Sequence, residues 1–132
     1  MRCQFVRPDR LLFEGNVHHL VLVSASGELG VWPGHAPEIC ALGNGVVRLT
    51  LPDDEGGDVV NIIVSGGYAE VGADHVIVLA NHARRSDDIE PDVVQRTKDE
   101  AIARRDTLPE GDNRRAYYNE KIAWCDLLLS HA

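Results

Sequence analysis

The segment NVHHLVLVSASGELGVWPGHAPEI, residues 16–39, joins an apolar run to a stretch rich in turn-forming residues. In the run, valines alternate with leucines, which indicates a strand whose two faces are both at least partly covered. The rest carries three glycines and two prolines, so it is neither a helix interior nor a regular central strand. Glu28 and His35 lie in this stiff stretch, and they are candidates for catalysis, metal binding or contact with a partner.

Similar apolar runs follow along the chain. GVVRLTL, DVVNIIVSGG and HVIVLAN, at residues 45–51, 58–67 and 75–81, place apolar side chains at alternate positions. Turn signals such as LGNG and PDDEGGD separate them, at a spacing typical of a sandwich or barrel. We expect a tight turn at the two glycines of SGG, residues 65–67. The pattern therefore predicts an all-β module that ends near Asn81.

Helices are expected in the last third of the chain, where no glycine occurs before Gly111. One of Ser86, Asp87 and Asp88 suits the cap of a first helix, and Pro91 suits its first helical position. The stretch LPEGDN then ends this helix. We therefore expect an N-terminal unit of residues 1–84 and a two-helix unit of residues 85–132.

The two expected helices differ in their apolar faces. In the first, Val94, Ala101 and Leu108 recur every seven residues and form a thin stripe. The second, residues 114–130, has a broader face. That face contains Tyr117, Tyr118, Ile122, Trp124, Cys125, Leu128 and Leu129. Short helices depend on packing in water, so this thin seam predicts a weakly held hairpin.

Composition narrows the class of protein. The net charge of −8 argues against a nucleic-acid binder, which normally shows a basic face. Three widely spaced cysteines indicate reduced thiols rather than a disulfide framework. The start shows no apolar run of the signal-peptide type, and no stretch approaches 18 apolar residues. We therefore expect a protein that neither spans a membrane nor is exported.

Catalytic and metal-binding motifs are not found. The six histidines form no HxH or HExxH, and consecutive His18 and His19 on a strand are expected to point to opposite faces. No GxSxG elbow and no GxxxxGK[ST] phosphate loop occurs. We therefore expect no metal and no cofactor. The alternatives that stay open are a small β-sandwich metalloenzyme and a free-standing binding module.

Nearly the whole chain resembles the epsilon subunits of F-type rotary ATP synthases, whose mitochondrial counterpart is called delta. The similarity covers LLFEGNV, SGELGVWPGHAP, NGVVRL, VSGGYAEV and HVIVLAN, in that order. Its most specific part is G-x-x-G-x-x-P-x-H-x-P, at Gly27, Gly30, Pro33, His35 and Pro37. The resemblance implies an N-terminal sandwich of about ten strands and a C-terminal hairpin of two helices.

The same resemblance implies a function without catalysis. Such subunits bind the gamma subunit and the ring of c subunits through the sandwich, within the rotating central stalk of a proton-translocating enzyme. Their helices either lie folded against the sandwich or extend along gamma toward the alpha and beta subunits, and in the extended state they restrain ATP hydrolysis. The implied location is peripheral, on the cytoplasmic face of a bacterial inner membrane, with membrane contact only through the complex.

The resemblance also assigns two groups of residues. The expected contact with the c ring consists of Glu28, Gly30, Pro33 and His35, in a loop whose stiffness limits the entropy lost on binding. The expected contact with the alpha/beta head is basic. It consists of Arg96, Lys98, Arg104, Arg105, Arg114, Arg115 and Lys121.

One family motif is degenerate in this chain. Some bacterial epsilon subunits bind ATP through [IL]-D-x-x-R-A at the start of the first helix. The matching stretch is IEPDVV, in which Glu90 replaces the aspartate and Val93 the arginine. Loss of the arginine removes a bidentate phosphate donor. We therefore expect no ATP site.

Overall fold

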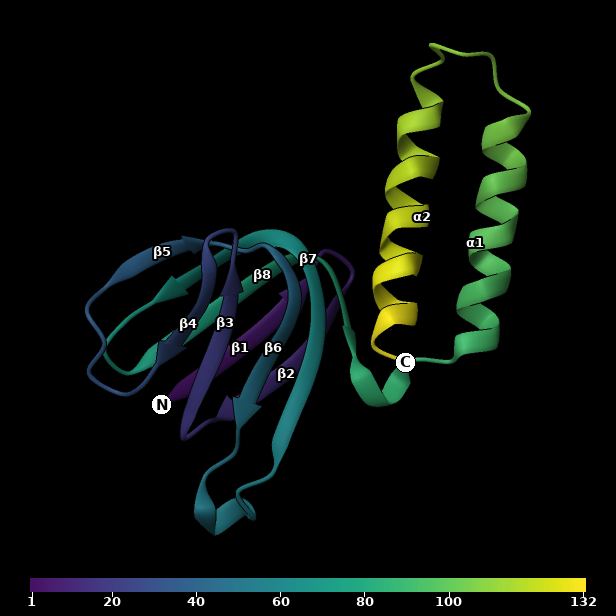
Figure 1. The fold of residues 1–132 in the computed structure, drawn as a ribbon. Coiled ribbons are helices and arrows are strands. Elements are labelled where there is room, and N and C mark those ends of the chain that lie inside the picture. The colour runs from purple at the N-terminus through teal and green to yellow at the C-terminus, as the bar shows by residue number, and fades with distance from the viewer. The chain divides into compact units, whose positions relative to one another are not determined.

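Eight strands and two helices make up the computed structural model, which describes residues 1–132 and divides into units of residues 1–86 and 87–132 (Figure 1). The strands are β1 (Arg2–Arg7), β2 (Arg10–Asn16), β3 (His19–Ser24), β4 (Gly27–Val31), β5 (Glu38–Ala41), β6 (Asn44–Thr50), β7 (Val59–Val71) and β8 (His75–Arg85). The helices are α1 (Pro91–Asp106) and α2 (Arg114–Ser130), and short 3-10 turns occur at Asp53–Glu55 and Ser86–Asp88. The predicted fold class, a β-sandwich followed by a helical hairpin, is confirmed.

The strands form two layers because β7 and β8 are long enough to take part in both. β7 pairs with β6 along residues 59–65 and with β5 along residues 68–71. β8 pairs with β1 along residues 75–79 and continues beside the first half of β7 to Arg85. One layer adds β6, β3 and β4 to this pair, and the other adds β5, β1 and β2. This sharing accounts for eight strands where about ten were expected.

Gly66 and Gly67 lie at the bend of β7. The expected tight turn here was wrong, because the strand continues through both glycines with φ of +69° and +118°. The Gly66 N–H donates to the carbonyl of Gly43 at 3.2 Å, just where β6 gives way to β5 as the neighbouring strand. A Cβ on Gly67 would overlap the carbonyl oxygen of Leu79 and lie 2.8 Å from the Cα of Ala80. Only glycine fits this crossing of two backbones.

One apolar core fills the space between the layers. Its members come from inward-facing positions of the strands and from the loops next to them, as the alternating pattern predicted. Complete burial of a large aliphatic or aromatic side chain stabilises a fold by roughly 1.5–3 kcal/mol. The buried side chains of this core are Cys3, Phe5, Val17, Leu20, Leu22, Val31, Leu42, Val47, Leu49, Ile62, Val64, Ala69, Val71, Val76, Val78, Ala80 and Ala83.

In the second unit, α1 and α2 form a hairpin with a narrow buried seam (Figure 1). Pro91 is the first residue of α1, as predicted, but Glu90 precedes it without a side-chain capping bond. The expected cap among residues 86–88 was wrong, because those residues form a separate 3-10 turn. A residue before proline is restricted to extended backbone, so Pro91 itself sets the start of the helix. The buried seam consists of Val94, Ala101, Ile122, Cys125 and Leu128.

Tyr117 was wrongly placed on the apolar face of α2, since its side chain is 62% exposed. The helix instead turns Ile122, Cys125 and Leu128 inward, at the spacing of three residues that one helix face allows. The Tyr117 ring packs edge-on against that of Tyr118, with 5.1 Å between centroids. The seam is therefore even narrower than the sequence pattern indicated.

Hydrogen bonds close the hairpin where its packing is thin. The Arg115 guanidinium donates to the carbonyl of Arg105, in the last turn of α1, at 2.8 Å and to that of Leu108, just past the helix, at 3.1 Å. Arg105 in turn donates to the side-chain oxygen of Asn119 on α2 at 3.1 Å. Carbonyls at a helix end lack partners within the helix. The two arginines thus tie the end of α1 to the start of α2.

Replacing Gly67 with alanine tests the bend in β7. We expect G67A to lower the free energy of unfolding by at least about 2 kcal/mol, because the new Cβ meets backbone atoms that cannot move aside. Urea denaturation of the full chain measures this. Gly27, with φ of +130° and nothing within 4 Å of an added Cβ, is the matched control. G27A should cost only about 1 kcal/mol, and equal losses would contradict this explanation of the bend.

Candidate functional site

The outer face of β4 carries Glu28, Gly30 and, in the loop that follows, Trp32. Glu28 accepts a hydrogen bond from the Nη2 of Arg48 on β6 at 2.6 Å. Because β3 lies between β4 and β6, the Arg48 side chain reaches across it to make this bond. Both side chains are about half exposed, at 57% for Glu28 and 44% for Arg48. An ion pair this open to water orients the carboxylate more than it stabilises the fold.

Trp32 lies flat on the sandwich surface over Gly30. Its ring stacks on that of His19 with 4.7 Å between centroids and 5° between planes. A Cβ at Gly30 would overlap the Cζ3 atom of the Trp32 ring. Gly30, which the sequence offered as a contact for the ring of c subunits, therefore has a structural role as well: it makes room for the indole.

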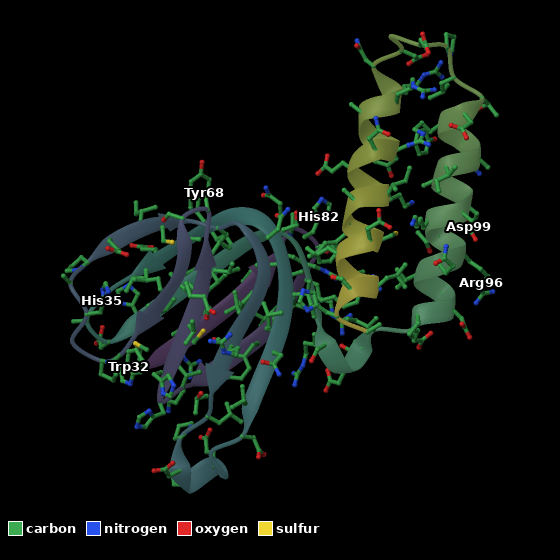
Figure 2. The ribbon with its side chains drawn as sticks, viewed as in Figure 1. Trp32, His35, Tyr68, His82, Arg96 and Asp99 are labelled. Atoms are coloured by element: carbon green, nitrogen blue, oxygen red, sulfur yellow. The ribbon has the colours of Figure 1, made fainter.

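The tip loop, residues 32–37, follows β4 and is held by its own backbone. The Gly34 N–H donates to the Ala73 carbonyl at 2.6 Å, and the His35 N–H donates to the Trp32 carbonyl at 3.2 Å. Nδ1 of His35 lies 2.7 Å from the carbonyl oxygen of Ala36, which accepts its hydrogen. Figure 2 shows Trp32 and His35 at the same end of the sandwich. Backbone bonds thus fix both the loop and the imidazole of His35.

Glu28 and His35 do not form one cluster. Four residue steps of extended chain, at about 3.3 Å each, separate Glu28 from Trp32, where the tip loop begins. The carboxylate of Glu28 contacts Arg48, whereas the imidazole of His35 contacts Ala36. The predicted contact residues therefore lie along one edge of the sandwich and do not converge on a single point. Such an arrangement suits recognition of a surface better than catalysis.

An open groove of about 530 Å³ runs beside Glu28, where β4 of one layer faces β5 of the other. Residues 24–29 and 38–41 line it, including Glu38 and the half-buried thiol of Cys40. Burial and the nearby carboxylate of Glu38 both raise the pKa of Cys40, which keeps it a thiol. β4 and β5 are both edge strands, and an edge strand leaves one row of backbone groups without a strand partner.

A row of exposed apolar side chains crosses the outer face of the other layer, and the sequence analysis missed it. Cross-strand pairing links Tyr68 to Leu79, Leu79 to Val6, and Val6 to Leu11. Tyr68 is 62% exposed, Leu79 54% and Leu11 50%, and Tyr68 projects outward in Figure 2. We call these four residues the outer row. Contiguous exposed apolar side chains of this kind commonly mark an interaction surface.

Five of the seven basic residues predicted to meet the alpha/beta head make contacts within the hairpin. Lys98 pairs with Asp126 across the two helices at 2.6 Å, and its hydrogen bond to that carboxylate raises the pKa of Lys98. Arg105 and Arg115 tie the hairpin end as described above, and Arg114 binds both carboxylate oxygens of Asp112. Arg96 lies on the outer side of α1 (Figure 2), where its Nε donates to the Asp92 carbonyl at 3.5 Å.

The degenerate ATP motif lies at the start of α1. Glu90 is the residue before the helix, and Val93 is 41% exposed. No three side chains of His, Cys, Asp or Glu gather where they could hold a metal ion. His18 and His19, expected on opposite faces, lie together instead, with 2.8 Å between their Nδ1 atoms. The reason is that β3 begins only at His19, so strand alternation does not reach His18.

Comparison with known proteins finds relatives of one family. Residues 1–86 match the family described as ATP synthase, Delta/Epsilon chain, beta-sandwich domain. An ATP synthase epsilon chain of Rippkaea orientalis is 36% identical over 87% of this chain and 82% of its own length. A chloroplastic ATP synthase epsilon chain of Coffea arabica is 34% identical over 88% of this chain and 83% of its own length.

Solved structures show a similar fold. A chain in the Euglena gracilis mitochondrial ATP synthase, OSCP/F1/c-ring structure, superimposes with a TM-score of 0.70 at 21% identity. That match covers 97% of this chain and 78% of the other. A chain in the Tetrahymena thermophila mitochondrial ATP synthase central stalk/c-ring structure gives a TM-score of 0.52 at 12% identity, over 98% and 93%. At these identities the likeness concerns the fold.

The acid response of the hairpin tests the contact between Asp112 and Arg114. Hydrogen bonds from the Arg114 side chain and backbone lower the pKa of Asp112 from 3.8 to about 2. A pKa lowered by folding means stability that is present above pH 4 and lost as the pH falls through 2. We expect D112N to remove this part of the acid dependence and to lower helix stability at pH 7, as followed by circular dichroism.

Glu110 supplies the matched control, because it is an exposed carboxylate in the same loop. The E110Q variant should lose as much stability between pH 4 and pH 2 as the wild type does. If D112N kept the same acid dependence as the wild type, the Asp112 contact would not stabilise the hairpin.

Proposed function

This chain belongs to the delta/epsilon family of ATP synthase subunits, and from that premise we propose that its sandwich joins two other rotor parts through two different surfaces. It is an epsilon-type, non-catalytic subunit of the central stalk of an F-type ATP synthase. In that position it couples rotation to ATP synthesis by transmitting force. The remaining question is which of its surfaces makes which contact.

The outer row is the surface that we assign to the gamma subunit. Tyr68 on β7, Leu79 on β8 and Leu11 on β2 are each at least half exposed. The half-buried Val6 on β1 links Leu79 to Leu11 in the same register. The centre of a stable protein interface is apolar and enriched in aromatic residues. Ile39, 76% exposed on the adjacent β5, extends the same layer. This in-register apolar row is the observation that carries the assignment.

The edge that carries Glu28, Gly30, Pro33 and His35 is the surface that we assign to the ring of c subunits. Its support is the rigidity of the backbone: hydrogen bonds to Ala73 and Trp32 fix the loop, and Arg48 orients the Glu28 carboxylate. A preformed loop loses little entropy on binding. The exposed carboxylate and the half-buried imidazole offer hydrogen bonds to polar loops of a partner.

The helical hairpin, within the unit of residues 87–132, is proposed as the regulatory part of the chain, able to meet the alpha/beta head when it opens. In the closed hairpin Lys98, Arg105, Arg114 and Arg115 contact atoms of the hairpin itself. When the hairpin opens, Lys98 and Arg115 lose these contacts and become able to bind acidic surfaces of the partner. A partner shifts this equilibrium only by binding the open form more tightly. Val93 supplies no phosphate donor, so we propose that ATP is not the switching ligand.

The ATP synthase complex to which such subunits belong is peripheral to a membrane in its F1 part. None of the helices combines the length and apolar character that crossing a bilayer requires. We propose that this subunit works at the cytoplasmic face of a bacterial membrane and reaches the bilayer only through its complex.

Substitutions in the outer row test the assignment to gamma. We expect Y68S and L79S to weaken binding to the purified gamma subunit of the same enzyme at least tenfold, because each removes apolar area from the centre of the contact. Surface plasmon resonance on the full chain measures the effect. Val59, 51% exposed on the other half of β7, is the matched control. Wild-type affinity in Y68S and L79S, or an equal loss in V59S, would refute the assignment.

Substitutions at the edge test the contact with the c ring. We expect E28Q and H35A to lower ATP-driven proton pumping per ATP hydrolysed in reconstituted vesicles, while circular dichroism of the chain stays unchanged. The control is E14Q, because Glu14 forms an equivalent exposed ion pair with Arg2 at 2.9 Å. Unchanged pumping ratios in E28Q and H35A would remove the edge from the coupling path.

A further inference from the structure

The base of the tip loop rests on two imidazoles. Trp32 stacks face to face on His19, with 4.7 Å between centroids, and His18 contacts His19 edge-on at 5.1 Å. The Nδ1 atoms of His18 and His19 are 2.8 Å apart, and Nε2 of His19 lies 3.3 Å from the Thr50 hydroxyl. These contacts connect the four side chains continuously from the tip loop to β6, and we call the three rings among them the stack.

The distance between the two Nδ1 atoms limits how many protons the pair can hold. A hydrogen bond of 2.8 Å needs one nitrogen to carry hydrogen and the other to present a lone pair. With one added proton on His19, its Nδ1–H donates to His18 and its Nε2–H donates to Thr50. That cation also lies over the indole face of Trp32, which attracts it. With two added protons, both Nδ1 atoms carry hydrogen and the contact is lost.

We propose that the stack of Trp32, His19 and His18 is a proton-responsive anchor of the tip loop. It holds the loop while the pair carries at most one added proton. When both imidazoles are protonated, the two cations repel each other, the His19 ring leaves its place against the indole of Trp32, and the loop is released. The value of this device to coupling rests on the proposed contact between the tip loop and the c ring. The anchor itself is a property of the isolated chain.

Other charged groups face this stack. His18 shares a shallow recess with the amino group of Met1 and with the carboxylates of Asp54 and Glu55. The ion pair of Glu28 and Arg48 flanks the stack on the same outer face of the sandwich. Imidazole is the side chain whose ordinary titration falls between pH 5 and 8. A response inside this window therefore points to the histidines.

His35 needs a separate control because it lies in the loop itself. Its Nδ1–H can donate to the Ala36 carbonyl in both the neutral and the cationic imidazole. Protonation of His35 therefore leaves that bond intact, unlike the contact between His18 and His19. A response that comes from the pair must survive replacement of His35.

The Gly34 amide reports directly on the anchor, because its N–H donates to the Ala73 carbonyl while the loop is seated. We expect its protection factor, measured by NMR hydrogen exchange on the full chain, to fall at least tenfold between pH 7 and pH 5. The amide of Ile62 in the core should keep its protection, which separates loop release from unfolding. W32A should lower Gly34 protection already at pH 7.

Three histidine variants decide whether the pair is responsible. H18Q should abolish the fall in Gly34 protection. In this variant a protonated His19 has no second imidazole cation beside it, so nothing displaces its ring. H35Q and H131Q should retain the fall. Constant Gly34 protection in the wild type, the same fall in H18Q, or its loss in H35Q or H131Q would each overturn the proposal. No c ring is present in this experiment, so its outcome is independent of the proposed contact.

Discussion

The antiparallel pairing of β7 with β8 is the interaction on which the sandwich depends. The two strands bend together where Gly67 crosses the carbonyl of Leu79, and the bend distributes one strand pair over both layers. β6 pairs with one half of β7 and β5 with the other, while β1 takes its place beside β8. The cross-strand neighbours Tyr68 and Leu79 belong to this same pair. The face assigned to gamma is therefore built into the strands that organise the fold, which suits a subunit that transmits force.

The tip loop depends on a second constraint of the same kind, in which a glycine makes room for a neighbour. Gly30 leaves space for the Trp32 ring, the ring lies on His19, and the loop that contains His35 begins directly after it. The hairpin, in contrast, depends on polar contacts more than on close packing. Its apolar seam is narrow, and the polar contacts of Lys98 and Arg115 supply what packing does not. The rigid parts of the molecule are thus the proposed docking surfaces, whereas the part with few buried contacts is the proposed switch.

Much of the fold was predictable because strand and helix periodicities are local properties of the sequence. α2 begins and ends where its apolar pattern does, and Pro91 opens α1. The SGG segment was misread because a bend within a strand and a turn both call for glycines with positive φ; only the pairing partners distinguish them. The outer row was missed because it consists of residues far apart in sequence, whose common face is set by strand order. Glu28 and His35 were singled out by the stiff loop that carries them and were assigned to the c ring by resemblance. No local rule foretold that Arg48 would reach Glu28 across β3.

Hydrogen–deuterium exchange of the full chain, measured with and without its gamma subunit, tests the central claim most directly. That claim is that the layer containing the outer row faces gamma. The account predicts that gamma protects amides of β5, the second half of β7, the first half of β8 and the facing residues of β1, while β3, β4 and β6 exchange as in the free chain. Protection centred on β3, β4 and β6, with the residues around Tyr68 and Leu79 unaffected, would contradict it.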